Sequence, residues 1–207
     1  MGDTHTIAIT RATDADTDVI ARVLARAFEG DPVFRWIVPD PDRRRWRFPP
    51  LFAAVADVFL THEETYVAGE GIAVALWAPP GKEPIPREHA ETFEQKVADI
   101  LEEDAERAGQ VQELMNERHP AEPAFYLQFM GVMPHEQGKG VGSRLMADML
   151  QRCDSNSTPA YLEATSLASR RLYERHGFEV VGEIAIPEGP SLWPMWRHPR
   201  GNSPRDQ

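Results

Sequence analysis

The sequence predicts an α/β fold with a mixed, mostly antiparallel sheet and helices on both faces of that sheet. Two short strand patterns, 65–68 and 72–78, are joined through Gly69-Glu70-Gly71, which is typical of an antiparallel hairpin. An apolar strand pattern through Met130 is separated by an amphipathic helix from another strand pattern through Leu162, and a helical crossover joins parallel strands. We therefore expect the strand through Met130 to lie centrally and to run parallel to the strand through Leu162.

Length and composition limit the classes of protein that fit. The 207 residues are enough for one compact domain over 1–207, with a polar tail at 199–207 that we expect to be flexible. Lys and Arg number 22 and Asp and Glu number 33, which leaves a net charge of −11. That acidity argues against a nucleic-acid partner, because phosphate contacts need clustered basic charge. It is compatible with a cationic ligand.

Several kinds of site and segment are not expected. A single cysteine, Cys153, excludes an internal disulfide and a cysteine-based zinc site, and it fits the core face of a helix better than a nucleophile. The seven histidines lack the spacing of a metal-binding pair, so we expect no metal. No signal peptide and no run of about 18 apolar residues is found, so we expect a cytoplasmic protein without a membrane partner. We expect a monomer or a homodimer.

The N-terminal part is expected to form a strand and two helices. Residues 6–10 alternate as a strand does, and residues 13–16 look like a helix cap. Apolar residues then recur at helical spacing until Gly30-Asp31-Pro32, which ends the helix. A second helix is expected to begin after Pro49-Pro50. The basic run 43–47 before it is interpreted as a solvated helix entry.

The C-terminal part alternates helices with strands. An acidic helical region is expected over 88–118, and its run Glu102-Glu103-Asp104 is interpreted as a solvated face. The segment 125–132 is apolar on both faces except at Gln128, as in a central strand. The elements expected after a loop that ends at Ser143 are a helix, a strand at 160–164, a helix at 169–176, strand signals at 180–181 and 184–186, and a strand at 192–197.

A glycine-rich loop separates the strand 125–132 from the amphipathic helix that follows. The loop has the sequence Gln137-Gly138-Lys139-Gly140-Val141-Gly142-Ser143. The first amides of a helix have no intrahelical acceptor and lie at the positive end of the helix dipole, so such a loop can bind phosphate. Glycine lets the backbone approach a ligand closely and adopt positive φ.

Three known motifs do not fit this loop. A P-loop fails at both ends, because Met133 stands where its first glycine belongs and Gly140 follows Lys139. A dinucleotide fingerprint fails at its third glycine, which is Ser143 here. The Gly-x-Ser-x-Gly elbow of a serine hydrolase is absent.

Two segments carry a family resemblance. The segment 131–142 closely resembles the acetyl-CoA-binding motif of the GNAT family of N-acetyltransferases, and 172–178 is similar to that family's Leu-Tyr-x-x-x-Gly-Phe. The resemblance implies a GNAT-type sheet and acetyl-CoA as co-substrate. Further segments, among them 159–163 and 187–190, are similar to the puromycin N-acetyltransferases. This likeness implies an aminonucleoside or another antibiotic-like amine as acceptor, and with it a role in antibiotic resistance.

The resemblance also implies which residues bind the coenzyme. In this family the loop amides bind the pyrophosphate and the preceding strand pairs with the pantetheine arm. Carried onto this sequence, the coenzyme-binding residues are Met130, Val132, Gln137, Gly138, Lys139, Gly140, Val141, Gly142, Ser143 and Ser169. The asparagine that often precedes the tyrosine in this family is missing, and Ser166 or Ser169 stands in its place. Basic residues gather near these segments, as a polyphosphate site would need, at His135, Lys139, Arg144, Arg152, Arg170, Arg171 and Arg175.

Acetyl transfer to an amine requires a base, donors to the oxyanion and an acid for the leaving thiolate. An amine with a pKa of about 10.4 is protonated at neutral pH and must lose a proton before it attacks. The resemblance assigns the oxyanion donors to amides near 130–132 and places Tyr173 near the coenzyme sulfur, so Tyr173 is the candidate acid. Glu163, at the end of a predicted strand, is the candidate base, acting directly or through water. Glu122 and His119 are weaker candidates.

Two functions remain open. The first is an acetyl-CoA-dependent N-acetyltransferase that acts on the primary amine of a small molecule. The second is a non-catalytic acyl-CoA-binding or regulatory module on the same fold. The intact glycine loop and Tyr173 favour the enzyme. The aromatic residues that are candidates for an acceptor pocket, although each taken singly fits a core, are Phe28, Phe34, Trp36, Trp193 and Trp196.

Overall fold

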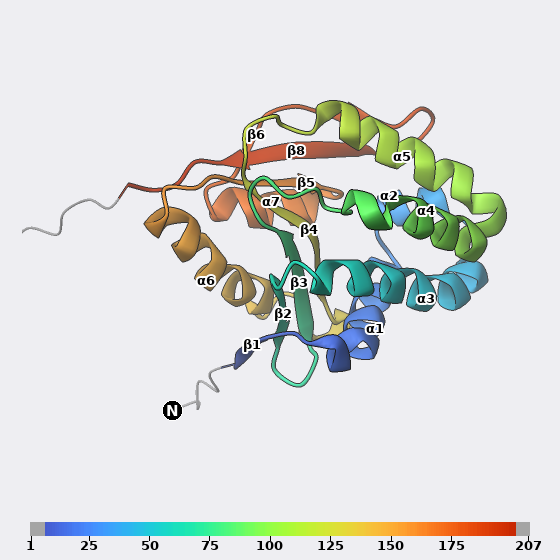
Figure 1. The fold of residues 1–207 in the computed structure, drawn as a ribbon, viewed down its shortest axis with the longest axis horizontal. Coiled ribbons are helices and arrows are strands. Elements are labelled where there is room, and N and C mark those ends of the chain that lie inside the picture. Colours follow the sequence, from blue (N-terminus) through green and yellow to red (C-terminus); the bar gives the residue numbers. More distant parts are fainter. Residues whose placement is uncertain (1–6, 202–207) are drawn as a thin grey trace, which may run out of the picture.

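A computed structural model describes residues 7–201 of the chain (Figure 1). The strands within this range are β1 (Ile9–Arg11), β2 (Thr65–Ala68), β3 (Ala73–Ala78), β4 (Phe125–Val132), β5 (Ala160–Ala164), β6 (Glu179–Val180), β7 (Ile184–Ala185) and β8 (Ser191–Arg197). The helices are α1 (Thr17–Phe28), α2 (Pro32–Ile37), α3 (Pro41–Leu60), α4 (Arg87–Leu101), α5 (Ala105–Arg118), α6 (Val141–Ser155) and α7 (Leu167–Arg175).

The strands form one mixed sheet. Their order is β1-β2-β3-β4-β5-β8-β6, and β7 pairs with β8 outside this path. Every hydrogen-bonded pair is antiparallel except β4 with β5, which is parallel. β4 lies in the middle of the order, so the predicted central position of the strand through Met130 and its parallel pairing with the strand through Leu162 are confirmed. The predicted fold class is confirmed with them.

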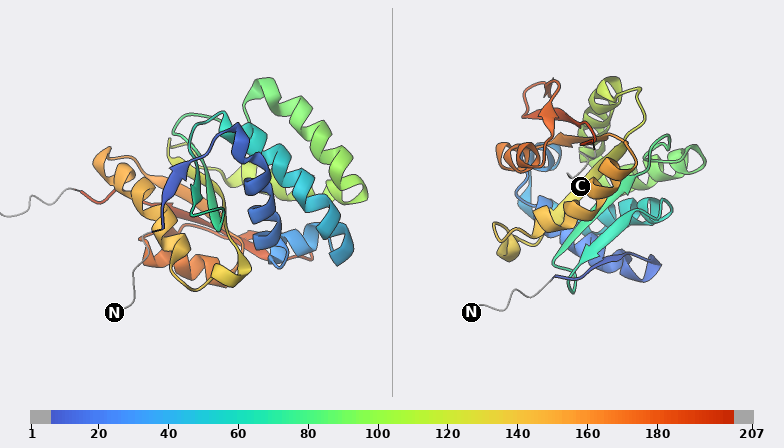
Figure 2. Two further views of the ribbon diagram at one scale, coloured as in Figure 1. Left: turned by 90° about the horizontal axis from the view of Figure 1, so that it is seen from below. Right: turned by 90° about the vertical axis from the view of Figure 1, so that its left-hand side faces the viewer.

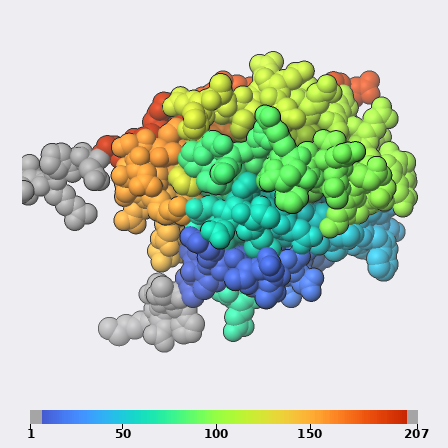
Figure 3. Space-filling view, viewed as in Figure 1, coloured from blue at the N-terminus to red at the C-terminus, as the bar shows by residue number. Residues whose placement is uncertain are grey.

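Helices cover both faces of the sheet (Figure 2). Because successive strand residues point to opposite faces, β3 contributes to two separate cores. Val74 and Leu76 pack with the buried residues of α1 to α5 on one face. Ala75 and Trp77 pack with α6 and α7 on the other. Figure 3 shows the outside of the first layer, where α4 and α5 (green) lie beside α3.

α1 packs closely against β4 because β4 has a glycine at the contact. A Cβ atom added at Gly131 would lie 3.0 Å from Cδ2 of Leu24 and 3.1 Å from Cβ of Ala27. Any larger residue would push the helix away from the strand. This contact sets the position of the C-terminal end of α1, and therefore the position of the loop from Glu29 to Asp31 that follows it.

The predicted start of the second long helix was wrong. α3 begins at Pro41, where Asp40 caps it by accepting hydrogen bonds from the amides of Asp42 and Arg43 at 2.8 and 3.0 Å, and it continues through Pro49-Pro50. Proline inside a helix removes a backbone donor. Both prolines are on the exposed side, so water can satisfy the carbonyl groups that they leave free. Packing of the buried face holds the helix together across them.

The sequence predicted that the basic run 43–47 and the acidic run 102–104 are solvated faces. In the structure the two runs instead bind each other. The guanidinium group of Arg47 donates to Glu102, Glu103 and Asp104 at 2.9, 2.9 and 2.7 Å. The side chain of Asp104 is only 4% exposed. Hydrogen bonds from Arg47 lower the pKa of Glu103 to about 2. The cluster fastens the corner between α4 and α5 to α3.

The ends of the chain match the sequence expectations in part. β1 begins at Ile9, within the predicted strand 6–10, of which residue 6 lies outside the described residues. In the predicted tail, the backbone N–H of Arg200 donates to Asp154 at 2.7 Å, and residues 202–207 lie outside the described range. Cys153 is buried in the core as predicted, and burial raises the pKa of its thiol to about 11.

Neither a membrane-spanning helix nor a metal-binding cluster is found within residues 7–201. Within that range, no helix is both long and apolar enough to cross a bilayer. The same residues contain no cluster of three or more His, Cys, Asp or Glu side chains arranged to hold a metal ion.

Candidate active site

The candidate site lies where β4 and β5 separate. The two strands pair through only two residue pairs, Phe125 with Ala160 and Tyr126 with Tyr161. Beyond these pairs β4 continues along β3, while β5 continues along β8. A cavity of about 1330 Å³ is lined by both strands past this point, and also by the glycine loop and by α1, α2, α4, α5 and α7.

β4 has an irregularity at the start of the separated segment. Leu76 of β3 pairs with Phe129, but the next residue, Trp77, pairs with Leu127, so Gln128 is extra in the ladder. A bulge of this kind bends a strand and redirects its side chains. Gln128 and Phe129 are half-buried and line the cavity. The sequence predicted a central strand that is apolar on both faces except at Gln128. In the structure β4 is instead only half-buried from Gln128 to Met130 and at Val132.

The residues predicted to bind the coenzyme lie together at one end of the cavity. Lys139 alone among the ten is not part of the lining, and its ammonium group forms an ion pair with Glu136 at 3.2 Å. The nine lining residues are Met130, Val132, Gln137, Gly138, Gly140, Val141, Gly142, Ser143 and Ser169. Their role in binding stays a prediction, but the structure does bring them to one wall.

The geometry of the glycine loop suits close approach of a ligand. Gly138 and Gly140 have φ values of +75° and +83°, and a Cβ added at either would meet no protein atom within 4 Å. Gly140 is followed directly by the first turn of α6, whose leading amides have no intrahelical acceptor. The side-chain amide of Gln137 donates to the carbonyl of Val132 at 3.0 Å, which ties the loop to β4.

Tyr173 and the two serines before it also line the cavity, from α7 and its N-terminus. Ser166 caps this helix, and its hydroxyl accepts a hydrogen bond from the amide of Ser169 at 3.1 Å. Tyr173 is 7% exposed and lines the cavity. Burial, and then the charge of Asp31, raise the pKa of its phenol above the usual range. The hydroxyl therefore keeps its proton at neutral pH, as a proton donor must.

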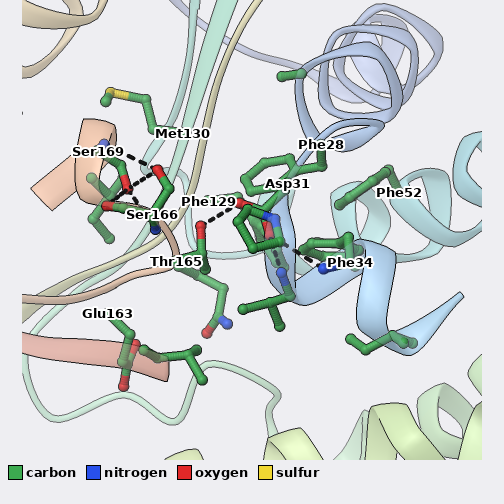
Figure 4. Close-up of a pocket in the computed structure, with 18 of the residues that line it drawn as sticks. Phe28, Asp31, Phe34, Phe52, Phe129, Met130, Glu163, Thr165, Ser166 and Ser169 are labelled. Atoms are coloured by element: carbon green, nitrogen blue, oxygen red, sulfur yellow. Dashed lines mark hydrogen bonds between the residues drawn. The ribbon is translucent and has the colours of Figure 1, made fainter. Parts of the chain in front are cut away.

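Glu163 has the environment of a general base (Figure 4). Its Oε2 accepts a hydrogen bond from the hydroxyl of Tyr126 at 2.7 Å. Its Oε1 is buried without a hydrogen-bond partner among the described residues. Burial raises the pKa of Glu163 to about 7, and the hydroxyls of Tyr126 and Tyr161 lower it by less. A group whose pKa is near the operating pH can both accept a proton and release it.

Asp31 is a site residue that the sequence analysis missed. Its Oδ1 caps α2 by accepting hydrogen bonds from the amides of Val33 and Phe34 at 2.9 and 3.2 Å. Its Oδ2 accepts the hydroxyl of Thr165, 134 residues away. Burial raises the pKa of this carboxyl, which lines the cavity. The dipeptide Asp31-Pro32 indicated a helix boundary, and no local signal showed that the second oxygen faces a site.

The remaining candidate residues differ in whether they line the cavity. His119 and Glu122 do not line the cavity, and the ring of His119 packs against those of Tyr126 and Tyr161, with centroids 4.9 and 5.3 Å apart. Among the five aromatic candidates, Phe28 and Phe34 line the cavity, whereas the three tryptophans do not. Arg152, expected near the polyphosphate, instead pairs with Glu64 at 2.8 Å.

Comparison with known proteins agrees with this geometry. Residues 82–198, more than half of the chain, match the family described as acetyltransferase (GNAT) domain. An uncharacterized N-acetyltransferase of Schizosaccharomyces pombe is 23% identical over 97% of this chain and 87% of its own length.

Three solved structures are also similar. A structure described as histone acetyltransferase HPA2 and related acetyltransferase from Corynebacterium glutamicum is 26% identical with a TM-score of 0.67, over 95% of this chain and 98% of its own. Arylalkylamine N-acetyltransferase 2 of Aedes aegypti is 15% identical with a TM-score of 0.66, over 95% and 100%. A polyamine N-acetyltransferase of Drosophila melanogaster is 17% identical with a TM-score of 0.55, over 93% and 99%.

The two insect enzymes are distant in sequence and show a shared fold. The comparisons support the family as a whole and no particular subgroup within it. The match over residues 82–198 includes the glycine loop, the separated strands and Tyr173, which are the parts from which the site is built. The chain belongs to the acetyltransferase (GNAT) family.

Proposed function

We propose that the protein transfers an acetyl group from acetyl-CoA to the primary amine of a small molecule, with Glu163 as base and Tyr173 as acid. The observation that carries this proposal is the half-buried carboxylate of Glu163, which has a pKa of about 7 and one buried oxygen without a partner among the described residues. It lies in the same cavity as the glycine loop and Tyr173.

The residues present fit acetyl-CoA, which supplies the acetyl group as a thioester. Gly138 and Gly140 leave open space beside the backbone of the loop. The backbone amides from Gly138 to Ser143 are the proposed ligands of the pyrophosphate of the coenzyme. The split between β4 and β5 leaves amides of 130–132 free of pairing with β5. These amides are the proposed donors to the acetyl oxygen as negative charge develops on it.

The proton balance follows from the two side chains. Glu163 accepts a proton from the substrate ammonium, directly or through one water, and the nitrogen lone pair then forms the new C–N bond. Tyr173 donates its hydroxyl proton to the sulfur as the C–S bond breaks. The products are the acetylated amine and the free thiol. The nitrogen carries a positive charge once the C–N bond has formed, and it loses a second proton, which passes through water to the tyrosinate. Glu163 releases the proton it took to solvent.

The comparisons suggest which amines to try. Similar structures are named as acetyltransferases of arylalkylamines, agmatine and polyamines, and the sequence segments similar to the puromycin enzymes add an aminonucleoside. Each of these is a primary amine that is cationic at neutral pH. An acidic chain with carboxylates lining its cavity is suited to such acceptors.

The direct test is release of free thiol from acetyl-CoA, followed with a disulfide dye, for a panel of primary amines. We expect turnover with at least one amine and a loss of about 10²-fold or more in kcat for Glu163→Gln. Trp46→Ala, which changes a side chain 81% exposed on α3, is the control and should leave kcat unchanged. Binding of acetyl-CoA without thiol release for any amine would indicate a non-catalytic module instead.

A further inference from the structure

The end of the cavity away from the glycine loop is aromatic. Phe28 and Phe34 have ring centroids 4.9 Å apart, and Phe129 lies 5.8 Å from Phe28 and 5.7 Å from Phe52. All four line the cavity, and Phe28, Phe34 and Phe129 are only half-buried, so their faces are available to a ligand. We call these four residues the phenylalanine chamber. Apolar residues of α4 and α5 complete its wall, namely Phe93, Val97, Leu101, Val111 and Met115.

The cavity is also negatively charged. Five carboxylates line it against two guanidinium groups, those of Arg26 and Arg175. Arg26 is paired with Glu29 at 3.0 Å, and Arg175 follows Tyr173 on α7, in the part of the cavity near the glycine loop. A cavity with this balance favours a cation over an anion at its aromatic end.

Asp31 lies between Glu163 and the phenylalanine chamber (Figure 4). Glu163 and Thr165 are two residues apart at the end of β5, and the hydroxyl of Thr165 donates to Asp31. The amides of Val33 and Phe34 and this hydroxyl supply three donors to the carboxylate of Asp31. A carboxylate has about four acceptor positions, so one remains for an ammonium group. Phe34, three residues later, puts a ring beside that position.

We propose that the acceptor is a monoamine with an apolar body about the size of one or two aromatic rings, whose ammonium group binds Asp31 and whose body lies in the phenylalanine chamber. This inference rests on the proposed function and adds the substrate class. Aromatic rings pack well against an apolar or aromatic body, and Asp31 is a single charged partner for a single ammonium. A second ammonium group placed among the phenylalanines would lose its hydration without a carboxylate to replace it.

A comparison of acceptors tests the substrate class. We expect kcat/KM for 2-phenylethylamine or tryptamine to exceed that for agmatine and spermidine by at least about tenfold, the factor that corresponds to 1.4 kcal/mol. An equal or higher kcat/KM for spermidine would overturn the inference and would indicate that the exposed carboxylates of Glu94 and Glu113 reach a second ammonium. Failure of every amine in the panel would count against the proposed function.

Measuring ligand binding directly tests the inference without requiring turnover. Calorimetry would compare 2-phenylethylamine with its neutral analogue 2-phenylethanol. Asp31→Asn keeps a side chain that caps helices well but removes the charge, so the preference for the amine over the alcohol should fall at least about tenfold. Phe34→Ala should weaken both ligands by a similar factor, and Trp46→Ala should change neither. If Asp31→Asn lowers the melting temperature but leaves the amine preference intact, Asp31 is only a helix cap and the inference fails.

Kinetics separate recognition from catalysis. A residue that holds the ammonium mainly affects the amine KM, whereas the base mainly affects kcat. We expect Asp31→Asn to raise the KM for 2-phenylethylamine at least about tenfold while kcat changes less than the KM and the acetyl-CoA KM stays the same. A large loss of kcat at unchanged KM would show that Asp31 acts in the chemical step instead and would overturn the assignment.

Discussion

The Nε2 atom of His176 lies 2.9 Å from the hydroxyl of Ser143, so the end of α7 is bonded to the first turn of α6. The guanidinium group of Arg197 donates to the backbone carbonyl of His176 at 3.0 Å and holds that residue from the other side. Burial, followed by the charges of three neighbouring arginines, lowers the pKa of His176, so its ring is neutral at pH 7. The proposed coenzyme end of the cavity is thus held by α7 as well as by β4.

Removing this bond should loosen the glycine loop. We expect His176→Ala to raise the Kd for acetyl-CoA several-fold, because a net hydrogen bond contributes about 1 kcal/mol. Isothermal calorimetry measures the change. His89→Ala, on the exposed surface of α4, is the control and should not affect it. An unchanged Kd in the His176 variant would mean that β4 alone positions the loop.

Gly142 offers a cleaner test of the loop than Gly140. Gly140 has a φ of +83°, so any substitution there adds backbone strain. A Cβ at Gly142 would lie 3.5 Å from both Leu172 and Met130, which is ordinary contact, and all three residues line the cavity. Gly142→Ala should therefore fold and keeps its backbone N–H, but its methyl group would hinder close approach of the phosphates to the loop, so acetyl-CoA binding should weaken about tenfold. Gly182→Ala, where a Cβ meets nothing within 4 Å, should bind normally.

Tyr173→Phe tests the proton donor. The ring and its packing remain, while the only acidic proton is lost, so kcat should fall by about 10²–10⁴-fold with little change in acetyl-CoA affinity. Thermal melting on the same preparation shows whether stability changed. A variant that keeps more than about a tenth of the wild-type kcat would mean that water or another side chain protonates the thiolate.

The pKa of Glu163 sets the expected pH dependence. A base must be deprotonated, so kcat/KM should rise with pH up to about 7, the pKa of Glu163, and then level off. In Glu163→Gln only the small neutral fraction of the amine reacts, so the rise should continue toward the amine pKa near 10. Tyr126→Phe removes a hydrogen bond that lowers the pKa of Glu163, so the inflection should move to higher pH. Inflections at the same pH in all three proteins would exclude Glu163 as the base.

Arg47 should matter for stability, in contrast to a nearby exposed arginine. Its side chain is 12% exposed and its partner Asp104 is 4% exposed, so Arg47→Ala leaves a buried carboxylate with weakened pairing. We expect a loss of about 3 kcal/mol in the free energy of unfolding, measured by urea denaturation. The side chain of Arg45 is 64% exposed, and Arg45→Ala should change this free energy by less than about 1 kcal/mol.

Sequence patterns were sufficient where an element depends on residues that are close together in the chain. The hairpin, β4, the glycine loop and α6 are each specified by residues within a few positions of one another, and all lie where the sequence predicted. Glu163 was identified as a candidate from its place at the end of a predicted strand, and Tyr173 from the resemblance of 172–178 to a family motif. The structure places both on one cavity.

Patterns were not sufficient where a residue depends on a distant partner. Asp31 is bonded to Thr165 across 134 residues, and Arg47 to Glu102 across 55. Helical periodicity describes each segment alone, so charged runs that form ion pairs with each other look the same as runs that face only water. The bulge at Gln128 depends on how β4 pairs with β3, which no single strand reveals.

The early separation of β4 from β5 gives the sheet an edge inside the molecule. Ordinary sheet edges lie on the surface, where their unpaired backbone groups can add a strand from another chain and so promote aggregation. Here the edge of β4 past Tyr126 faces a cavity lined by helices instead. A thin extended ligand can reach such an edge, but a folded chain cannot. We therefore expect the same break in pairing to admit narrow, extended ligands and to prevent association through this edge.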